Sequence, residues 1–122
     1  MSTAVVERLE KRAAEEAIES AHEALGLGYA ELASALGVDR RTVLRYRQRR
    51  TVPTRRVRAR LEKLRELRHL LGEVFADADE GLAWLYSPVE ILRNRRPIDL
   101  VREGALDTVI SVLAGIHSGA HV

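Results

Sequence analysis

The chain has 122 residues, of which 46% are hydrophobic and 31% charged, and its formal net charge at pH 7 is +2. A chain of this length can bury a hydrophobic core without disulfides or a structural metal. Because it contains no cysteine, disulfides, thiolate zinc sites, iron–sulfur clusters and cysteine nucleophiles are excluded. No apolar run approaches the roughly 20 residues that span a bilayer, and residues 1–19 are charged throughout. We therefore expect a cytoplasmic protein without a signal peptide or membrane segment.

The small net charge conceals an asymmetry along the chain. Residues 39–68 carry 13 basic and 3 acidic side chains, a net charge of +10, whereas residues 1–38 and residues 69–122 each carry a net charge of −4. Such a concentration of positive charge indicates that the middle of the chain binds a polyanion. A solvated basic helix face is the alternative interpretation.

Nearly the whole sequence predicts α-helix, because apolar residues recur at spacings of three and four. A long amphipathic helix is expected over residues 3–25, followed by a helical pair over residues 29–49. Pro53 then interrupts the chain, and a basic helix is expected over residues 54–75. Residues 1–75 are therefore predicted to form a helical DNA-binding domain.

The remaining residues, 76–122, predict a small C-terminal helical lobe, so that the fold is all-α. Ser87-Pro88-Val89-Glu90 is typical of a helix start, with a capping serine and a proline at the first helical position. Pro97 starts another short helix, which Gly104 ends. The last helix is expected over residues 105–118.

Residues 29–48 fit the packing of a DNA-binding helix-turn-helix. Ala33 is small where the two helices cross, Gly37 can adopt the positive φ of the tight turn, and Asp39 can cap the second helix. The predicted shared core consists of Leu32, Leu36, Val38, Val43 and Tyr46.

The exposed side chains of the second helix suggest DNA recognition. In this motif the second helix lies in the major groove, where Arg recognises guanine and Gln recognises adenine. The candidate base-reading residues are Arg41, Arg45 and Gln48, with Leu44 able to contact a thymine methyl. The candidate phosphate-binding residues, which set register without reading sequence, are Arg40, Thr42, Arg47, Arg49, Arg50, Arg55 and Arg56. A three-helix unit that makes only protein contacts is the minority interpretation.

A distinctive pattern occupies the C-terminal lobe. Trp84-Leu85 is followed by Ser87-Pro88, then by Pro97-x-Asp99-Leu100-Val101-x-x-Gly104 and by a final amphipathic helix that ends at Gly119. In this pattern, residues 84–122 resemble the toxin-binding domain of the MbcA/ParS/Xre antitoxins. That family places the domain after an Xre-like helix-turn-helix, so the resemblance covers residues 25–122, and it is closest to the MbcA branch.

The resemblance implies a bacterial type II antitoxin that silences a toxin encoded beside it and represses their shared promoter. The usual partner of the MbcA and Xre branches is a RES-domain toxin that degrades NAD, whereas the ParS branch pairs with an ADP-ribosyltransferase. In such complexes the C-terminal lobe covers the toxin's active-site cleft. The expected toxin contacts are polar or terminal residues, namely Arg93, Arg95, Arg96, Pro97, Arg102, His117, Ser118, Gly119, Ala120, His121 and Val122.

Taken without the family, the arginines at 93, 95 and 96 would repel one another unless an anion or an acidic partner neutralises them, and a solvated turn is the equal alternative. No set of residues predicts catalysis or a cofactor. His117 and His121 are four residues apart, but Gly119 breaks the helix between them, so no metal site is expected.

Two functions remain open from the sequence. The first is an antitoxin that binds both a toxin and operator DNA. The second is a stand-alone transcriptional regulator whose C-terminal lobe dimerises or senses a ligand. In either case we expect a homo-oligomer, because helix-turn-helix proteins usually place two recognition helices on a palindrome, and with toxin a larger hetero-oligomer.

Overall fold

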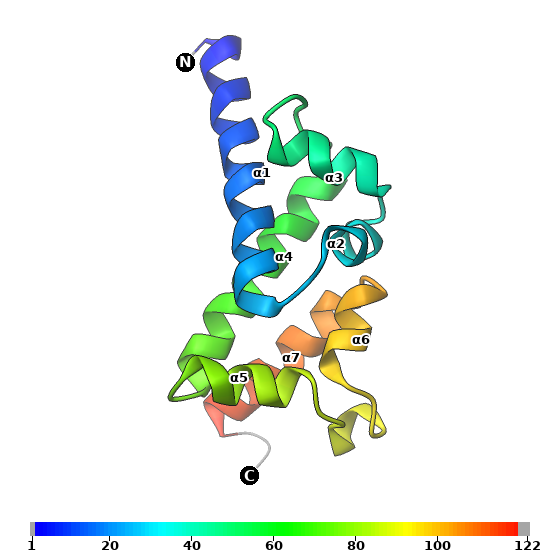
Figure 1. Ribbon diagram of the computed structural model, residues 1–122. Coiled ribbons are helices and arrows are strands. Elements are labelled where there is room, and N and C mark those ends of the chain that lie inside the picture. Colours follow the sequence, from blue (N-terminus) through cyan, green and yellow to red (C-terminus); the bar gives the residue numbers. More distant parts are fainter. Residues whose placement is uncertain (1, 120–122) are drawn as a thin grey trace.

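The computed structural model describes residues 2–119, and helices dominate this part of the chain (Figure 1). The elements are α1 (Thr3–Leu25), α2 (Tyr29–Leu36), α3 (Arg40–Arg47), α4 (Arg55–Val74), α5 (Ala78–Leu85), the 3₁₀ turn η1 (Glu90–Leu92), α6 (Pro97–Arg102) and α7 (Leu106–Ser118). Within residues 2–119 there is no strand, only one antiparallel bridge between Val89 and Arg95. The all-α prediction is confirmed.

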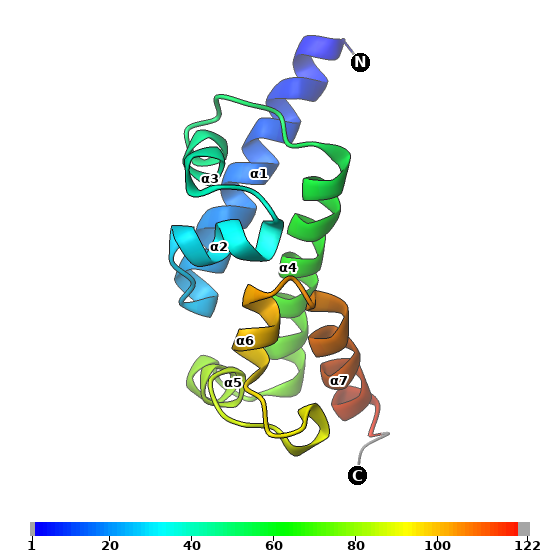
Figure 2. The ribbon, with the colours of Figure 1, turned by 90° about the vertical axis from the view of Figure 1, so that its right-hand side faces the viewer.

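The helices form two lobes that share α4. The N-terminal lobe packs α1, α2 and α3 around the first half of α4, and the C-terminal lobe packs α5, α6 and α7 around its second half (Figures 1 and 2). One face of α4 is buried along its whole length through Val57, Leu61, Leu64, Leu67 and Leu71. The hydrophobic core is therefore continuous from one lobe to the other.

Local signals fix most helix ends where the sequence predicts them. Ser2 caps α1 by accepting a hydrogen bond from Val5 N, and Gly26 ends that helix in the left-handed region at φ 69°. Thr54 caps α4 by accepting from Val57 N. Gly104, at φ 84°, follows α6, and Gly119, at φ 77°, ends α7, as expected.

Helix α3 ends at Arg47, two residues before the predicted end. Arg49 adopts the left-handed conformation at φ 58°, and the N–H of Arg50 donates to the carbonyl of Arg45 at 2.9 Å. This is the hydrogen bond that closes a helix C-terminus, here made without glycine. Gln48, Arg49 and Arg50 therefore lie in the loop after the recognition helix rather than on it.

The helix predicted to start at Ser87 does not form. The Ser87 hydroxyl donates to the carbonyl of Ala83, so it stays with the end of α5 instead of capping a new helix. The N–H of Val89 donates to the carbonyl of Arg95 at 3.1 Å, which folds the segment back on itself and leaves only η1. Arg93 and Asn94, at φ 59° and 63°, turn this hairpin. A backbone pairing between residues six positions apart thus overrides the start signal at Ser87.

No helix in the described part of the chain is both long and apolar enough to cross a membrane.

Candidate functional site

The segment from α2 to α3 has helix-turn-helix geometry. Ala33 is buried where the helices cross, and the turn between them runs through Gly37 at φ 72°. This positive φ favours glycine, whereas the nearest neighbour of an added Cβ would be Arg60 Nη1 at 2.7 Å, the end of a flexible side chain that can shift. Asp39 caps α3 by accepting from Thr42 N at 2.8 Å, and hydrogen bonding by the side chain and then the backbone of Thr42 lowers the pKa of the Asp39 carboxyl. The motif predicted over residues 29–48 is therefore present.

The inward and outward faces of α3 also match the prediction. Val43 and Tyr46 are buried against α1 and α2, and burial raises the pKa of the Tyr46 hydroxyl. On the outward side Thr42 and Leu44 are half-buried, and the exposed side chains are Arg40, Arg41, Arg45 and Gln48. Arg50, Arg55 and Arg56, in the following loop and first turn of α4, are exposed as well.

The arginines of this region fall into two groups according to their partners. Arg40, Arg41, Arg45, Arg50, Arg55 and Arg56 form no ion pair with any residue in the range 2–119. Arg47 and Arg49, also predicted to bind phosphates, instead pair with glutamates of α1. Arg47 Nε lies 2.7 Å from Glu19 Oε1, and Arg49 pairs with Glu15. The guanidinium of Arg47 also lies over the Tyr29 ring, 5.1 Å from its centroid.

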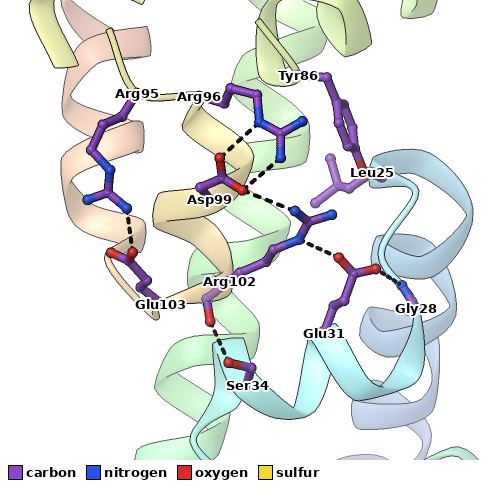
Figure 3. A network of polar contacts seen from close by, with 10 residues as sticks. All are labelled: Leu25, Gly28, Glu31, Ser34, Tyr86, Arg95, Arg96, Asp99, Arg102 and Glu103. Carbon is purple, nitrogen blue, oxygen red and sulfur yellow. Dashed lines mark hydrogen bonds and ion pairs between the residues drawn. The ribbon is translucent and has the colours of Figure 1, made fainter. Parts of the chain in front are cut away.

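A second polar cluster lies between the lobes and joins α6 to α2 (Figure 3). Arg96 binds Asp99 through two hydrogen bonds of 2.9 Å, and Arg102 binds the same carboxylate at 3.0 Å. Arg102 also pairs with Glu31 on α2. We call Glu31, Arg96, Asp99 and Arg102 the interlobe cluster.

Two further hydrogen bonds tie the lobes together beside this cluster (Figure 3). Ser34 Oγ on α2 donates to the carbonyl of Arg102 at 2.7 Å, and the Tyr86 hydroxyl donates to the carbonyl of Leu25 at 2.7 Å. Because these bonds join the helix-turn-helix and the end of α1 to the C-terminal lobe, they fix how the two lobes are oriented.

The electrostatics of the interlobe cluster favour its ionised form. The hydrogen bonds from Arg96 hold the pKa of the Asp99 carboxyl below its ordinary value, with a further lowering contribution from Arg102. Burial raises the pKa of the Tyr86 hydroxyl, which donates its hydrogen bond to the carbonyl of Leu25.

The predicted toxin contacts are not gathered into one patch. Arg96 and Arg102 belong to the interlobe cluster, Arg95 pairs with Glu103, and Pro97 is buried, so its ring faces the core rather than a partner. Arg93 is exposed at the tip of the hairpin. His117, Ser118 and Gly119 are exposed at the end of α7, and Ala120, His121 and Val122 lie outside the described residues.

The mutual repulsion expected among Arg93, Arg95 and Arg96 is relieved within the chain itself. Glu103 pairs with Arg95 and Asp99 pairs with Arg96, so two of these arginines are neutralised by the same chain and do not need a partner's charge. One signal was available in the sequence: Arg96, Asp99 and Arg102 recur at a spacing of three, which places oppositely charged side chains on one helix face. The contributions of Glu31, Ser34 and Tyr86 have no such local signal, since they come from distant segments.

The described residues offer no group of three or more His, Asp or Glu side chains able to hold a metal ion.

Comparison with known proteins gives one consistent family. Residues 70–119 match the Xre/MbcA/ParS antitoxin C-terminal toxin-binding domain. The mycobacterial cidal antitoxins MbcA of Mycobacterium bovis and Mycobacterium tuberculosis are 32% identical over 105 residues, covering 86% of this chain and 92% of each relative. A chain in the crystal structure of the M. tuberculosis MbcT–MbcA toxin–antitoxin complex superposes with a TM-score of 0.64 at 31% identity, covering 88% of this chain and 96% of that one. The chain therefore belongs to the Xre/MbcA/ParS family of antitoxins.

Proposed function

We propose that this antitoxin binds a RES-domain toxin that degrades NAD, blocks the toxin's active site through the C-terminal lobe, and represses its own operon through the helix-turn-helix. The observation that carries the proposal is the likeness to MbcA along nearly the whole chain, including a structure taken from a toxin–antitoxin complex. We place this activity in the bacterial cytoplasm, where NAD and the operator are both present. Membership of an antitoxin family favours this function over a stand-alone regulator.

The toxin-facing surface is proposed at the end of the C-terminal lobe that lies away from the helix-turn-helix. Both η1 and the end of α7 lie at this end of the molecule (Figures 1 and 2). Two large apolar side chains are exposed on these elements, Ile91 at 55% and Ile116 at 37%. Exposed apolar groups beside polar ones are typical of a protein-binding surface. Arg93 and His117 are the polar neighbours that we expect to contact the toxin.

Four of the predicted toxin contacts are proposed to support this surface without touching the toxin, namely Arg95, Arg96, Pro97 and Arg102. Their ion pairs and burial hold the hairpin on α6, so we expect them to position the contact residues rather than to enter the toxin cleft. The terminal residues Ala120, His121 and Val122 remain our candidates for insertion into the cleft, together with Ser118 and Gly119.

DNA binding is proposed through the exposed faces of α3 and the start of α4. The first turn of α4 carries arginines and no acidic residue, which opposes the helix dipole, whereas the N-terminus of α3 already has the Asp39 carboxylate. A DNA phosphate at the start of α4 would offset the unfavourable charge there, because helix N-termini are favourable sites for anions. Arg41, Arg45 and Gln48 are proposed to read bases, with Leu44 against a thymine methyl, and Arg40, Thr42, Arg50, Arg55 and Arg56 to bind phosphates.

Self-association is proposed through the groove between α1 and α4. The groove has a volume of about 370 Å³, and its floor contains Ala14, Ala17 and Leu61. The charged side chains that line it largely neutralise one another, since Glu10 pairs with Arg58 and Glu62 with Arg65, so a second copy of the same surface would meet little net repulsion. Val6 and Leu9, exposed on α1, extend the apolar surface.

The experiment that tests the toxin claim is co-expression with the product of the adjacent gene, followed by pull-down and an assay of NAD consumption. We expect a stable complex and loss of NAD degradation at a near-stoichiometric ratio of antitoxin to toxin. A co-purifying toxin that does not consume NAD would overturn the RES assignment, and a complex that still consumes NAD would overturn blocking of the active site.

A truncated chain separates the tail from the rest of the lobe. Deletion of residues 120–122 leaves α7 and its capping Gly119 in place, so the fold should persist. We expect weaker inhibition by the truncated antitoxin in the same titration, with Arg93→Ala in the full chain as the parallel variant. Equal inhibition by truncated and full-length antitoxin would exclude the tail and leave the hairpin as the contact.

A further inference from the structure

Three glutamates spaced along α1 pair with arginines of the basic segment, residues 39–68. Glu19 pairs with Arg47, Glu15 with Arg49, and Glu10 with Arg58. These pairs join positions 28, 34 and 48 residues apart in sequence, and they run in order along the helix. We call Glu10, Glu15 and Glu19 the acidic row.

The acidic row is more enclosed than the other glutamates of α1, which are exposed. The side chains of Glu10, Glu15 and Glu19 are 24%, 29% and 30% exposed, whereas that of Glu16, which pairs only with Arg12 on the same helix, is 64% exposed. Glu19 also accepts a hydrogen bond from the Tyr29 hydroxyl at 3.0 Å, which fixes its carboxylate beside Arg47. These carboxylates are therefore held in position against the arginines.

A carboxylate and a DNA phosphate offer an arginine the same kind of oxygen acceptor. An arginine that already binds a carboxylate releases fewer counterions when DNA approaches, since part of its charge is neutralised beforehand. The acidic row therefore stands where phosphate would otherwise be bound at the end of α3, in the loop that follows it and on α4.

We propose that the acidic row is a built-in competitor of DNA, which withholds Arg47, Arg49 and Arg58 from the phosphate backbone and lowers the affinity of this antitoxin for DNA. The proposal rests on the DNA binding proposed above and concerns its regulation. In the wild-type chain Arg47 and Arg49 then bind glutamates of α1 and not DNA phosphates. The DNA contacts are made by the arginines of α3 and α4 that form no ion pair in the described residues.

The direct test is the pair of substitutions Glu15→Gln and Glu19→Gln in the full-length chain. Glutamine keeps an amide oxygen for the Tyr29 hydroxyl but removes the charge. Binding to a 30-base-pair duplex is measured by fluorescence anisotropy across a salt series. We expect about tenfold tighter binding at low salt, and a slope of log K against log salt that is steeper by roughly 0.9 for each arginine released, or about 2 per chain.

The matched control is Glu7→Gln with Glu16→Gln, which removes the same charge from the same helix. In the described part of the chain Glu7 has no ion pair, and Glu16 pairs only with Arg12. The control should leave the salt slope unchanged. If the control and the Glu15/Glu19 variant give equal slopes, the gain reflects overall charge and the proposal is overturned.

A second pair of variants keeps the proposal testable even if loss of the glutamates perturbs folding. Arg49→Gln alone should leave DNA affinity and slope unchanged, because this arginine is already withheld, and Glu15→Gln combined with Arg49→Gln should return to wild-type behaviour. A large loss of affinity on Arg49→Gln would show that Arg49 contacts DNA in the wild type and would overturn the proposal. Absence of salt-dependent binding by every protein, wild type included, would instead remove the proposed DNA binding itself.

Discussion

The two arginine-rich regions of this chain use the same side chain in opposite ways. Exposed arginines on α3 and at the start of α4 form no ion pair with a carboxylate within residues 2–119, namely Arg40, Arg41, Arg45, Arg55 and Arg56. In the C-terminal lobe Arg95, Arg96 and Arg102 are each held by a carboxylate of the same chain. The difference teaches that local counter-charge, rather than arginine content, separates a surface suited to an external anion from one that holds a fold together.

The largest expected effect tests the exposed group as a whole. If six to eight phosphates are neutralised, log K for DNA should fall with log salt at a slope of roughly −5 to −7, so that affinity drops by roughly 10³ to 10⁴ between 50 and 200 mM salt. Fluorescence anisotropy with a labelled duplex measures this slope. A salt slope near zero would show that the exposed arginines of α3 and α4 do not bind DNA, and the two regions would then not differ in function.

The next effect separates base reading from phosphate binding within the exposed group. Arg45→Ala should cost on the order of 1 to 3 kcal/mol of DNA affinity and relax preference at one base position. Arg55→Ala should weaken binding to all sequences alike, because a phosphate contact carries no sequence information. Binding to a library of operator variants distinguishes the two. Identical profiles for both substitutions would contradict these assignments.

The third prediction concerns the ion-paired arginines of the C-terminal lobe, and the quantity measured is the free energy of unfolding. Arg102→Ala removes the ion-pair partner of Glu31 and one of the two arginines that bind Asp99, and it should lower the free energy of unfolding by about 2 kcal/mol. Arg93→Ala, at an exposed position without an ion pair in the described residues, should change it by less than about 0.5 kcal/mol. Urea denaturation of both variants measures this difference in stability. Equal unfolding midpoints for Arg102→Ala and Arg93→Ala would contradict the prediction.

The smallest effect is the pH dependence of the interlobe cluster. Because Arg96 and Arg102 lower the pKa of Asp99 in the folded chain, its carboxylate stabilises the fold above the ordinary aspartate pKa of 3.8, and this contribution is lost as the pH falls through the lowered value. Since the group is partly exposed, we expect about 1 kcal/mol or less.

The measurement for this effect is the free energy of unfolding at pH 7 and near pH 3. Asp99→Asn should show a smaller loss on acidification than the wild type, while Asp79→Asn, on the exposed first turn of α5, should lose as much as the wild type. Parallel acid profiles for wild type and Asp99→Asn would show that the cluster does not respond to pH.

Most of the fold could be predicted because its signals are local. The stop at Gly26, the turn at Gly37 and the cap at Asp39 each act within a few residues, and the spacing of apolar residues identified the buried face of α4. The start signal at Ser87 failed because a competing signal lies just after it. The backbone pairing of Val89 with Arg95, six residues apart, requires the residues between them to fold back and outweighed the helix start.

The partners of the charged residues were the least predictable part of the candidate sites. Exposure of Arg41 and Arg45 follows from helix periodicity once Val43 and Tyr46 are assigned to the core. Pairing of Arg49 with Glu15, or of Arg102 with Glu31, depends on which helices pack together and has no sequence signal. Sequence therefore indicated where the cations lie but not which of them are already neutralised.

The sharing of α4 between the two lobes limits how this chain could be recombined with its relatives. A chimaera joined at residue 76 would keep α4 from one parent and set against it the α7 of another, across the contact that includes the ion pair between Lys63 and Asp107. A C-terminal lobe transferred to a relative has to be transferred together with α4. The transferred α4 must then pack against the α1 of the recipient. In this chain, the proposed preference for an operator and the preference for a toxin can therefore diverge freely only through surface residues, because α4 belongs to the cores of both lobes.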